Sequence, residues 1–153
     1  MTMLTHPTYS YSGDNLKGDV SYDAFITANP DADPTDDHAF EVMVWLAAYD
    51  GYLPIGGGEN GNPTEKVQIG GETWTLFNGQ NTNNGNTWTV YSFMAPTTTN
   101  HYQGDLNEFF KYLTDQGKIP ADYYLQVAQG GTEAVSGQNA VFSVKSYTMG
   151  YNI

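Results

Sequence analysis

Runs that alternate apolar and polar side chains constrain this sequence most, because successive side chains of a β-strand point to opposite faces. In the run 40–46, valines and a leucine occupy one face, and Glu41, Met43 and Trp45 occupy the other. Burying a carboxylate costs free energy, and an indole that faces water makes no apolar contacts, so this second face suits the lining of a cleft. The alternative is a glutamate on an edge strand that faces solvent.

Two further runs carry acids in the same manner. In the run 19–27, Asp19 and Asp23 fall on the polar face. If this run lies beside 40–46, we expect Asp23 to come close to Glu41 and to raise its pKa or share its proton. The run 123–135 reaches Glu133 through a Gly-Gly pair, which predicts either a turn or a strand rim that directs the acid into a groove.

Glu41 and Glu133 form a pair of carboxyl groups in distant segments. Glycoside hydrolysis uses such a pair, because one group protonates the departing oxygen while the other attacks carbon or activates water. The sequence gives no distance between the two acids. The hypothesis therefore requires that they converge on one groove.

The other segments indicate an all-β chain with a short helix. Leu106, Phe109, Phe110 and Leu113 form an apolar stripe, which predicts a helix capped by Asp105. We expect Gly117 to end this helix. The remaining expectations are a hairpin around Gly70-Gly71, a long loop at 51–63 that forms a cleft wall, a turn at 78–86, and strands at 87–95 and 140–148.

Charge and composition exclude several classes of function. The chain has 153 residues, a formal net charge of −12, five lysines and no arginine. Such a field repels nucleic acids and anionic membranes, so we expect neither as a partner, whereas a neutral polysaccharide is not repelled. The three histidines, His6, His38 and His101, show no ligand spacing in the sequence. We expect no metal and no cofactor, and the acidic segment 29–38 is predicted to be a solvated loop rather than a calcium loop.

The order of several motifs resembles glycoside hydrolase family 12, over about residues 18 to 150. The motif Glu-x-Met-x-Trp at 41–45 and the motif Gly-Thr-Glu at 131–133 are the most specific parts of this resemblance. The other segments that carry it are 22–25, 54–56, 79–93 and 104–113.

This resemblance implies an endo-β-1,4-glucanase or xyloglucanase on a jelly-roll β-sandwich of two antiparallel sheets, which retains anomeric configuration. By resemblance, Glu41 is the nucleophile, Glu133 the general acid/base and Asp23 the aspartate that supports the nucleophile. Met43 and Trp45 match the cleft floor. We further expect substrate contacts from Pro54, Tyr91 and Trp74.

The resemblance also implies that residues 1–153 form a single domain that lacks the family's N-terminal strands. An inactive fragment or a non-catalytic carbohydrate-binding module is therefore the alternative function, and a surface protein that only retains the fold is a third. We expect a monomer, or a dimer formed through exposed sheet edges. The family implies an extracellular protein, although the sequence begins without a signal peptide.

Overall fold

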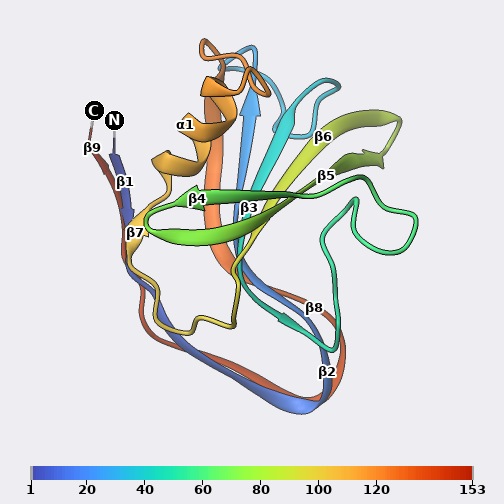
Figure 1. The fold of residues 1–153 in the computed structure, drawn as a ribbon, viewed down its shortest axis with the longest axis vertical. Helices are drawn as coiled ribbons and strands as arrows, with labels where there is room; N and C mark the ends of the chain where they lie inside the picture. Colours follow the sequence, from blue (N-terminus) through green and yellow to red (C-terminus); the bar gives the residue numbers. More distant parts are fainter. Residues whose placement is uncertain (1, 153) are drawn as a thin grey trace.

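The computed structural model describes residues 2–152, and their strands form two sheets with a helix beside them (Figure 1). The elements are β1 Thr2–Thr5, β2 Thr8–Thr27, β3 Phe40–Tyr49, β4 Glu65–Ile69, β5 Glu72–Asn83, β6 Asn86–Met94, β7 Gly104–Asp105, α1 Asn107–Asp115, β8 Tyr124–Ser146 and β9 Met149–Asn152. The prediction of a mostly β chain with a short helix is confirmed.

The larger sheet has six strands in the order β4-β5-β6-β3-β2-β8. Its neighbours pair antiparallel except β3 and β6, which are parallel, so the expectation of purely antiparallel sheets is wrong at this one pairing. β2 and β8 run side by side from Thr8↔Ser146 to Thr27↔Tyr124, and Figure 1 shows both as long, bent strands. The smaller sheet joins the two ends of the chain in the order β7-β1-β9.

One face of the larger sheet, here called the core face, packs against α1. Phe109 is fully buried and its ring lies against Trp74 and Phe93, with centroids 4.9 and 5.0 Å apart. Aliphatic residues of β2 and β3 belong to the same buried cluster, as the alternation predicted. Burial of this cluster is the main contribution to the stability of the sandwich.

The helix follows the predicted stripe but is capped differently. Asp105 lies one position before the N-cap, Leu106, and its Oδ1 accepts hydrogen bonds from the N–H groups of Asn107 (3.0 Å) and Met3 (2.7 Å). The helix ends before Gly117, whose φ of 65° is the left-handed conformation expected of a C-terminal glycine. α1 has nine residues, and none of the described helical structure is long and apolar enough to cross a membrane.

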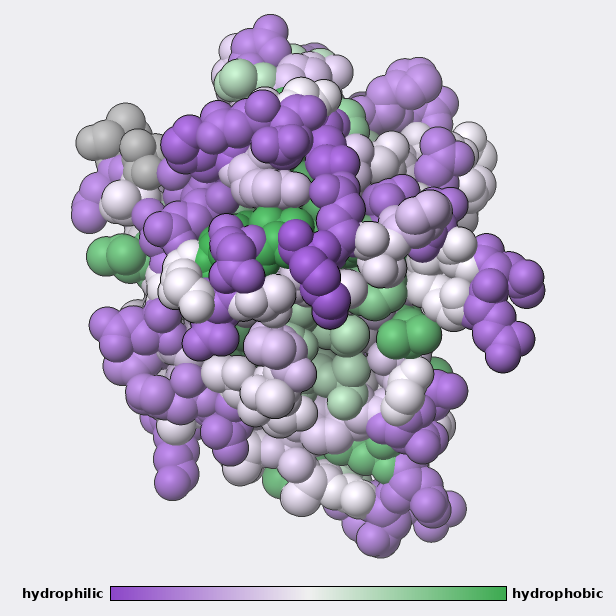
Figure 2. All heavy atoms as spheres, in the orientation of Figure 1, coloured by the Kyte–Doolittle hydropathy of each residue, from purple (hydrophilic) through white to green (hydrophobic). Residues whose placement is uncertain are grey.

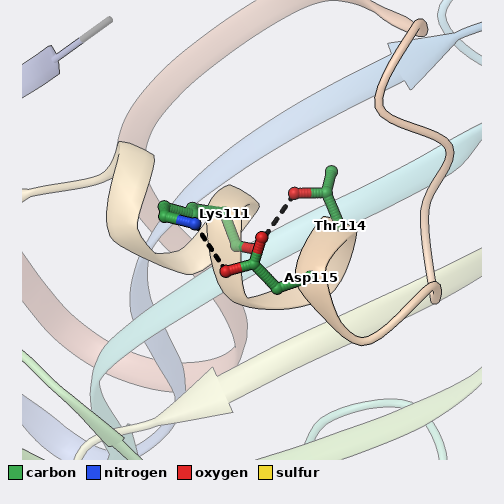
Figure 3. A network of polar contacts seen from close by, with 3 residues as sticks. All are labelled: Lys111, Thr114 and Asp115. Atoms are coloured by element: carbon green, nitrogen blue, oxygen red, sulfur yellow. Dashed lines mark hydrogen bonds and ion pairs between the residues drawn. The ribbon is translucent and has the colours of Figure 1, made fainter.

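The outer surface of α1 is polar. Figure 3 shows the ion pair between Lys111 Nζ and Asp115 Oδ2 (2.5 Å), one helical turn apart, and Thr114 Oγ1, which donates to the Lys111 carbonyl (3.0 Å). Both charged side chains are exposed, so the pair contributes little to stability. Hydrophilic residues also dominate the rim of the molecule in Figure 2.

Two sequence predictions of strand boundaries are wrong. The segment 78–86 was predicted as a turn, but β5 continues to Asn83 and the turn is confined to Asn84-Gly85, both with positive φ. The run 140–148 was predicted as a strand of its own, but it belongs to β8, which runs without a break from Tyr124 to Ser146. In each case pairing with a long neighbouring strand outweighs the local turn preference of Asn and Gly.

β8 forms one edge of the larger sheet, and within residues 2–152 its partner strand is β2. It exposes the apolar side chains of Val135, Val141 and Val144. Long, apolar edges favour pairing with another strand. Whether the protein is a monomer or an edge-paired dimer stays a prediction.

Candidate functional site

The face opposite the core face collects the predicted acids and is here called the acidic face. Asp19 lies directly across from Glu133 on β8, and Asp23 lies across from Met43 on β3. Directly opposed residues of an antiparallel pair share a face. Glu41 on β3 lies directly across from Phe25 on β2, and Phe25 is on the same face of β2 as Asp19 and Asp23. The carboxyl groups of Asp19, Asp23, Glu41 and Glu133 therefore all lie on one side of the sheet.

Glu41 is held in a small apolar cluster made by residues of β3 and β6. The side chain is 7 % exposed, and its Oε2 accepts a hydrogen bond from Trp88 Nε1 at 2.6 Å. Burial raises the pKa of Glu41, the Trp88 hydrogen bond lowers it, and the charge of Glu133 raises it, with a net increase. Trp88 was not identified from the sequence, because β3 and β6 are far apart in the chain and their parallel pairing leaves no local signal.

Asp23 was expected to lie near Glu41, and the structure pairs their strands. Burial raises the pKa of Asp23 to about 7, and the charges of Glu41 and Glu133 add to this increase. Its Oδ1 is buried and has no hydrogen-bond partner within residues 2–152. Three carboxyl groups thus interact electrostatically, and Asp23 holds a proton until near-neutral pH.

Asp19 joins this group, although the sequence suggested no role for it. Its side chain is 0 % exposed, Oδ1 accepts a hydrogen bond from Ser21 Oγ (2.9 Å), and its pKa is raised to about 7 by burial and by Glu133. Thr132 Oγ1 also donates to the Asp19 carbonyl at 2.6 Å. The available signal was the spacing Asp-x-Ser-x-Asp, which puts Asp19 on the face of Asp23.

Glu133 lies in the middle of β8 and is exposed. Of the two predictions for the Gly-Gly pair, the strand is confirmed and the turn is wrong. A Cβ on Gly130 would meet Tyr22 and Tyr147 at 3.1 and 3.2 Å on the core face, whereas at Gly131, on the acidic face, it would meet nothing within 4 Å. Gly131 therefore leaves the acidic face open beside Glu133. A shallow cavity of about 150 Å³ lies here, lined by Ser21, Asp23, Gln129, Gly130, Gly131, Thr132 and Glu133.

Trp45 and Met43 lie on the acidic face but are covered. They are 2 % and 5 % exposed, and Trp45 Nε1 points to Met43 Sδ at 3.5 Å. Tyr52 stacks on Trp45 with ring centroids 5.3 Å apart and an interplanar angle of 29°. A tight turn at Asp50-Gly51, where both φ values are positive, directs Tyr52 back over the sheet. Tyr52 therefore covers Trp45 on the acidic face, and sequence patterning did not single out this tyrosine.

The segment 51–63 contains no strand and packs across β5 on the acidic face. Ile55 Cγ2 lies 2.6 Å from the position that a Cβ on Gly79 would occupy, so the glycine is needed for this close approach. Pro54 is buried within the segment, and its carbonyl accepts the Gly57 N–H at 2.9 Å. That the segment forms a cleft wall, and that Pro54 contacts substrate, both stay predictions.

Trp74 and Tyr91 were expected to contact substrate, and the structure places both on the core face. Trp74 is 2 % exposed, packs against Phe109, and donates from Nε1 to the Ile69 carbonyl at 3.2 Å. Tyr91 stacks on Phe40 with ring centroids 6.2 Å apart. The prediction is wrong for these two residues, because the register of β5 and β6 turns them away from Glu41.

Within residues 2–152, no group of three or more His, Cys, Asp or Glu side chains is arranged to hold a metal ion. The four acids of the acidic face are spread along three strands, and burial raises the pKa values of three of them, Asp19, Asp23 and Glu41. The arrangement can therefore supply one ionised carboxyl group and protons held nearby, which are the requirements of acid/base chemistry with a nucleophile.

The buried acids predict an unusual dependence of stability on pH. Asp19 titrates at about 7 in the folded chain and at 3.8 without its environment. Because the folded state binds this proton more tightly, the free energy of unfolding falls as pH rises between these values, by up to about 1.4 kcal/mol per pH unit. We expect Asp19→Asn to match the parent protein at pH 4 and to be more stable than it at pH 8.

Urea unfolding at both pH values measures this difference. Asp50→Asn, an exposed acid in a turn, controls for the exchange of an acid for an amide. An Asp19→Asn protein whose stability relative to the parent is the same at pH 4 and pH 8 would contradict the prediction.

Comparison with known proteins gives consistent matches. The sequence model of a family described as "Glycosyl hydrolase family 12" matches residues 1–152. Xyloglucan-specific endo-beta-1,4-glucanase A of Aspergillus niger is 40% identical over 141 residues, which are 92% of this chain and 55% of that protein. A probable xyloglucan-specific endo-beta-1,4-glucanase A of Aspergillus fumigatus is also 40% identical over the same shares. The chain thus spans about half the length of the curated relatives that it matches.

Solved structures show the same fold. Endoglucanase 3 of Trichoderma harzianum superposes with a TM-score of 0.81 and 36% identity, over 99% of this chain and 63% of that one. The catalytic domain of Humicola grisea Cel12A, solved with a soaked thio cellotetraose, gives a TM-score of 0.84 and 32% identity, over 97% of this chain and 63% of that one. The two sheets and the helix match the jelly-roll sandwich of these structures.

Proposed function

The chain belongs to glycosyl hydrolase family 12, and we propose that it hydrolyses internal bonds of β-1,4-glucans with retention of anomeric configuration. One observation carries this proposal. Glu41 and Glu133 share one face of the sheet, close enough that the charge of Glu133 raises the pKa of Glu41. Their environments differ, since Glu41 is buried and Glu133 is exposed. We extend the proposal to residues 1–153 as a single hydrolase domain.

In the first step, Glu41 attacks the anomeric carbon while Glu133 donates its proton to the glycosidic oxygen. The bond between carbon and oxygen breaks, the departing sugar leaves as an alcohol, and a glycosyl ester forms on Glu41. In the second step, Glu133 takes a proton from water, the hydroxide attacks the same carbon, and Glu41 is released. Retention requires carboxyl groups roughly 5–5.5 Å apart, and this separation stays a prediction.

The neighbours of Glu41 have distinct roles in this proposal. The Trp88 hydrogen bond favours the carboxylate form that attacks, because it lowers the pKa that burial raises. Asp23 carries a proton until about pH 7, so it can remain neutral beside a charged Glu41. Asp19, whose pKa is also raised to about 7, lies directly opposite Glu133 across β2 and β8.

Xyloglucan is the first substrate to test, because the relatives at 40% identity are named xyloglucan-specific. Mixed-linkage glucan and cellulose are the alternatives. The three polymers are neutral, and the net charge of −12 does not oppose their binding. Secretion of the protein stays a prediction.

Proton NMR of the earliest products tests the proposal directly. We expect new reducing ends from xyloglucan, and we expect the β-anomer to form before mutarotation. The α-anomer as first product would overturn retention. Binding of the polymer without any new reducing end would instead favour the carbohydrate-binding function, which is compatible with a chain that spans about half of its relatives.

A further inference from the structure

Two histidines that are 95 positions apart in the sequence meet at the junction of the two sheets. His6 follows β1, and His101 lies in the segment between β6 and β7. Their Nε2 atoms are 3.3 Å apart, and the rings cross at 73° with centroids 4.8 Å apart. Sequence spacing gave no indication of this pair.

From this geometry we propose that His6 and His101 form a binding site for a borderline divalent cation of the Zn²⁺ class. Two imidazole nitrogens bound to one tetrahedral Zn²⁺ at about 2.0–2.1 Å lie roughly 3.3 Å from each other. The short distance between centroids shows that the two nitrogens converge at an angle and do not point along one line. An ion set to the side of the pair would therefore meet both lone pairs.

The environment of His101 is compatible with the required tautomer. Its Nδ1 is 2.9 Å from Thr8 Oγ1, and Thr8 accepts this hydrogen bond when the proton of His101 is on Nδ1. A histidine that donates from one ring nitrogen keeps the lone pair of the other free, and this is the usual arrangement around metal-bound imidazoles. Thr8 thus acts as the outer partner of the site.

The backbone holds both histidines in place without an ion. The His6 N–H donates to the Thr148 carbonyl at 3.0 Å, and Thr8 pairs with His101 as an isolated antiparallel bridge. Tyr9 N–H also donates to the Asn100 carbonyl at 3.1 Å. Because the backbone on both sides is already ordered, binding an ion costs little conformational entropy. A site with two protein ligands can therefore bind an ion whose other coordination positions are filled by water.

The site does not depend on hydrolase activity and has a structural consequence. An ion bound by both histidines would join the β1–β2 corner to the segment between β6 and β7, closing a long loop of the chain. The negative net charge of the protein raises the local concentration of cations. Imidazole ligands favour Zn²⁺ over the oxygen-preferring Mg²⁺.

Isothermal titration with zinc chloride tests the proposal on the full chain, with magnesium chloride as the comparison ion. We expect saturable binding of one Zn²⁺ per chain, a higher Tm with Zn²⁺ present, and no binding of Mg²⁺. His6→Asn and His101→Asn should each abolish the binding and the rise in Tm. His38→Asn is the matched control and should keep both, since His38 is exposed and its φ of 67° is one that asparagine tolerates.

Two further measurements keep the test independent of folding. In the parent protein, imidazole NMR signals of His6 and His101, but not of His38, should shift on addition of Zn²⁺. Thr8→Val should raise the Kd by about tenfold or more, because it removes the outer hydrogen bond. The proposal is overturned if the parent shows no saturable Zn²⁺ binding, or if binding persists unchanged in both histidine variants.

Discussion

Glu41→Gln is expected to lower kcat for glucan hydrolysis by roughly 10⁴-fold or more, because the amide cannot form the glycosyl ester. Gln is isosteric, and its carbonyl oxygen can still accept the Trp88 Nε1–H. Removing a buried carboxyl group whose pKa is raised should not destabilise the fold. Binding of the polymer should persist, so the loss should appear in kcat rather than in affinity.

Release of reducing ends and isothermal titration with the polymer measure these two quantities. Glu72→Gln, which changes an exposed glutamate at the start of β5, is the matched control and should keep full activity. Residual activity of the Glu41→Gln protein within tenfold of the parent would mean that another group attacks the sugar.

Glu133→Ala is expected to lower kcat/KM on polysaccharide by roughly 10²- to 10⁴-fold, since an alcohol leaves poorly without a proton. The first step on an aryl glycoside with an acidic phenol should lose far less, because such a leaving group departs as the anion. Glu133 is exposed on β8, so its truncation should cost little stability. A comparison of the two substrates separates proton transfer from general damage to the cleft.

A burst of phenol followed by slow turnover would show that the glycosyl ester forms and that water then lacks its base. The Glu41→Gln protein serves as the contrast, because it should lose activity on both substrates alike. Equal losses of the Glu133→Ala protein on polysaccharide and aryl glycoside would contradict the acid/base assignment.

Local patterns predicted several elements well. The alternation in 19–27 and 40–46 identified the faces of β2 and β3, and the apolar stripe around Phe109 identified α1. Such patterns succeed because the periods of a strand and a helix are properties of the local backbone. They failed at 78–86 and could not choose between a turn and a strand at Gly130-Gly131, because at both places a long partner strand carries the pairing through residues that favour turns.

The acids illustrate the same division. Glu41, Asp23 and Glu133 could be selected as candidates because polar residues interrupt apolar runs, and the family resemblance then suggested their roles. Trp88 and Asp19 were missed as functional neighbours, since each acts on an acid of another strand through contacts that only sheet pairing creates. Trp74 and Tyr91 were expected to contact substrate, but the pairing of β5 and β6 places both on the core face.

The sequence by itself determined the strand content, the short helix, the strong negative charge and which two glutamates are the candidates for catalysis. Only the tertiary structure decided that β2 lies between β3 and β8, and this order brings Asp19, Asp23, Glu41 and Glu133 to one face. It also decided that His6 and His101 meet. The physical reason is that side-chain periodicity is local, whereas strand order and register depend on which distant apolar faces exclude water together.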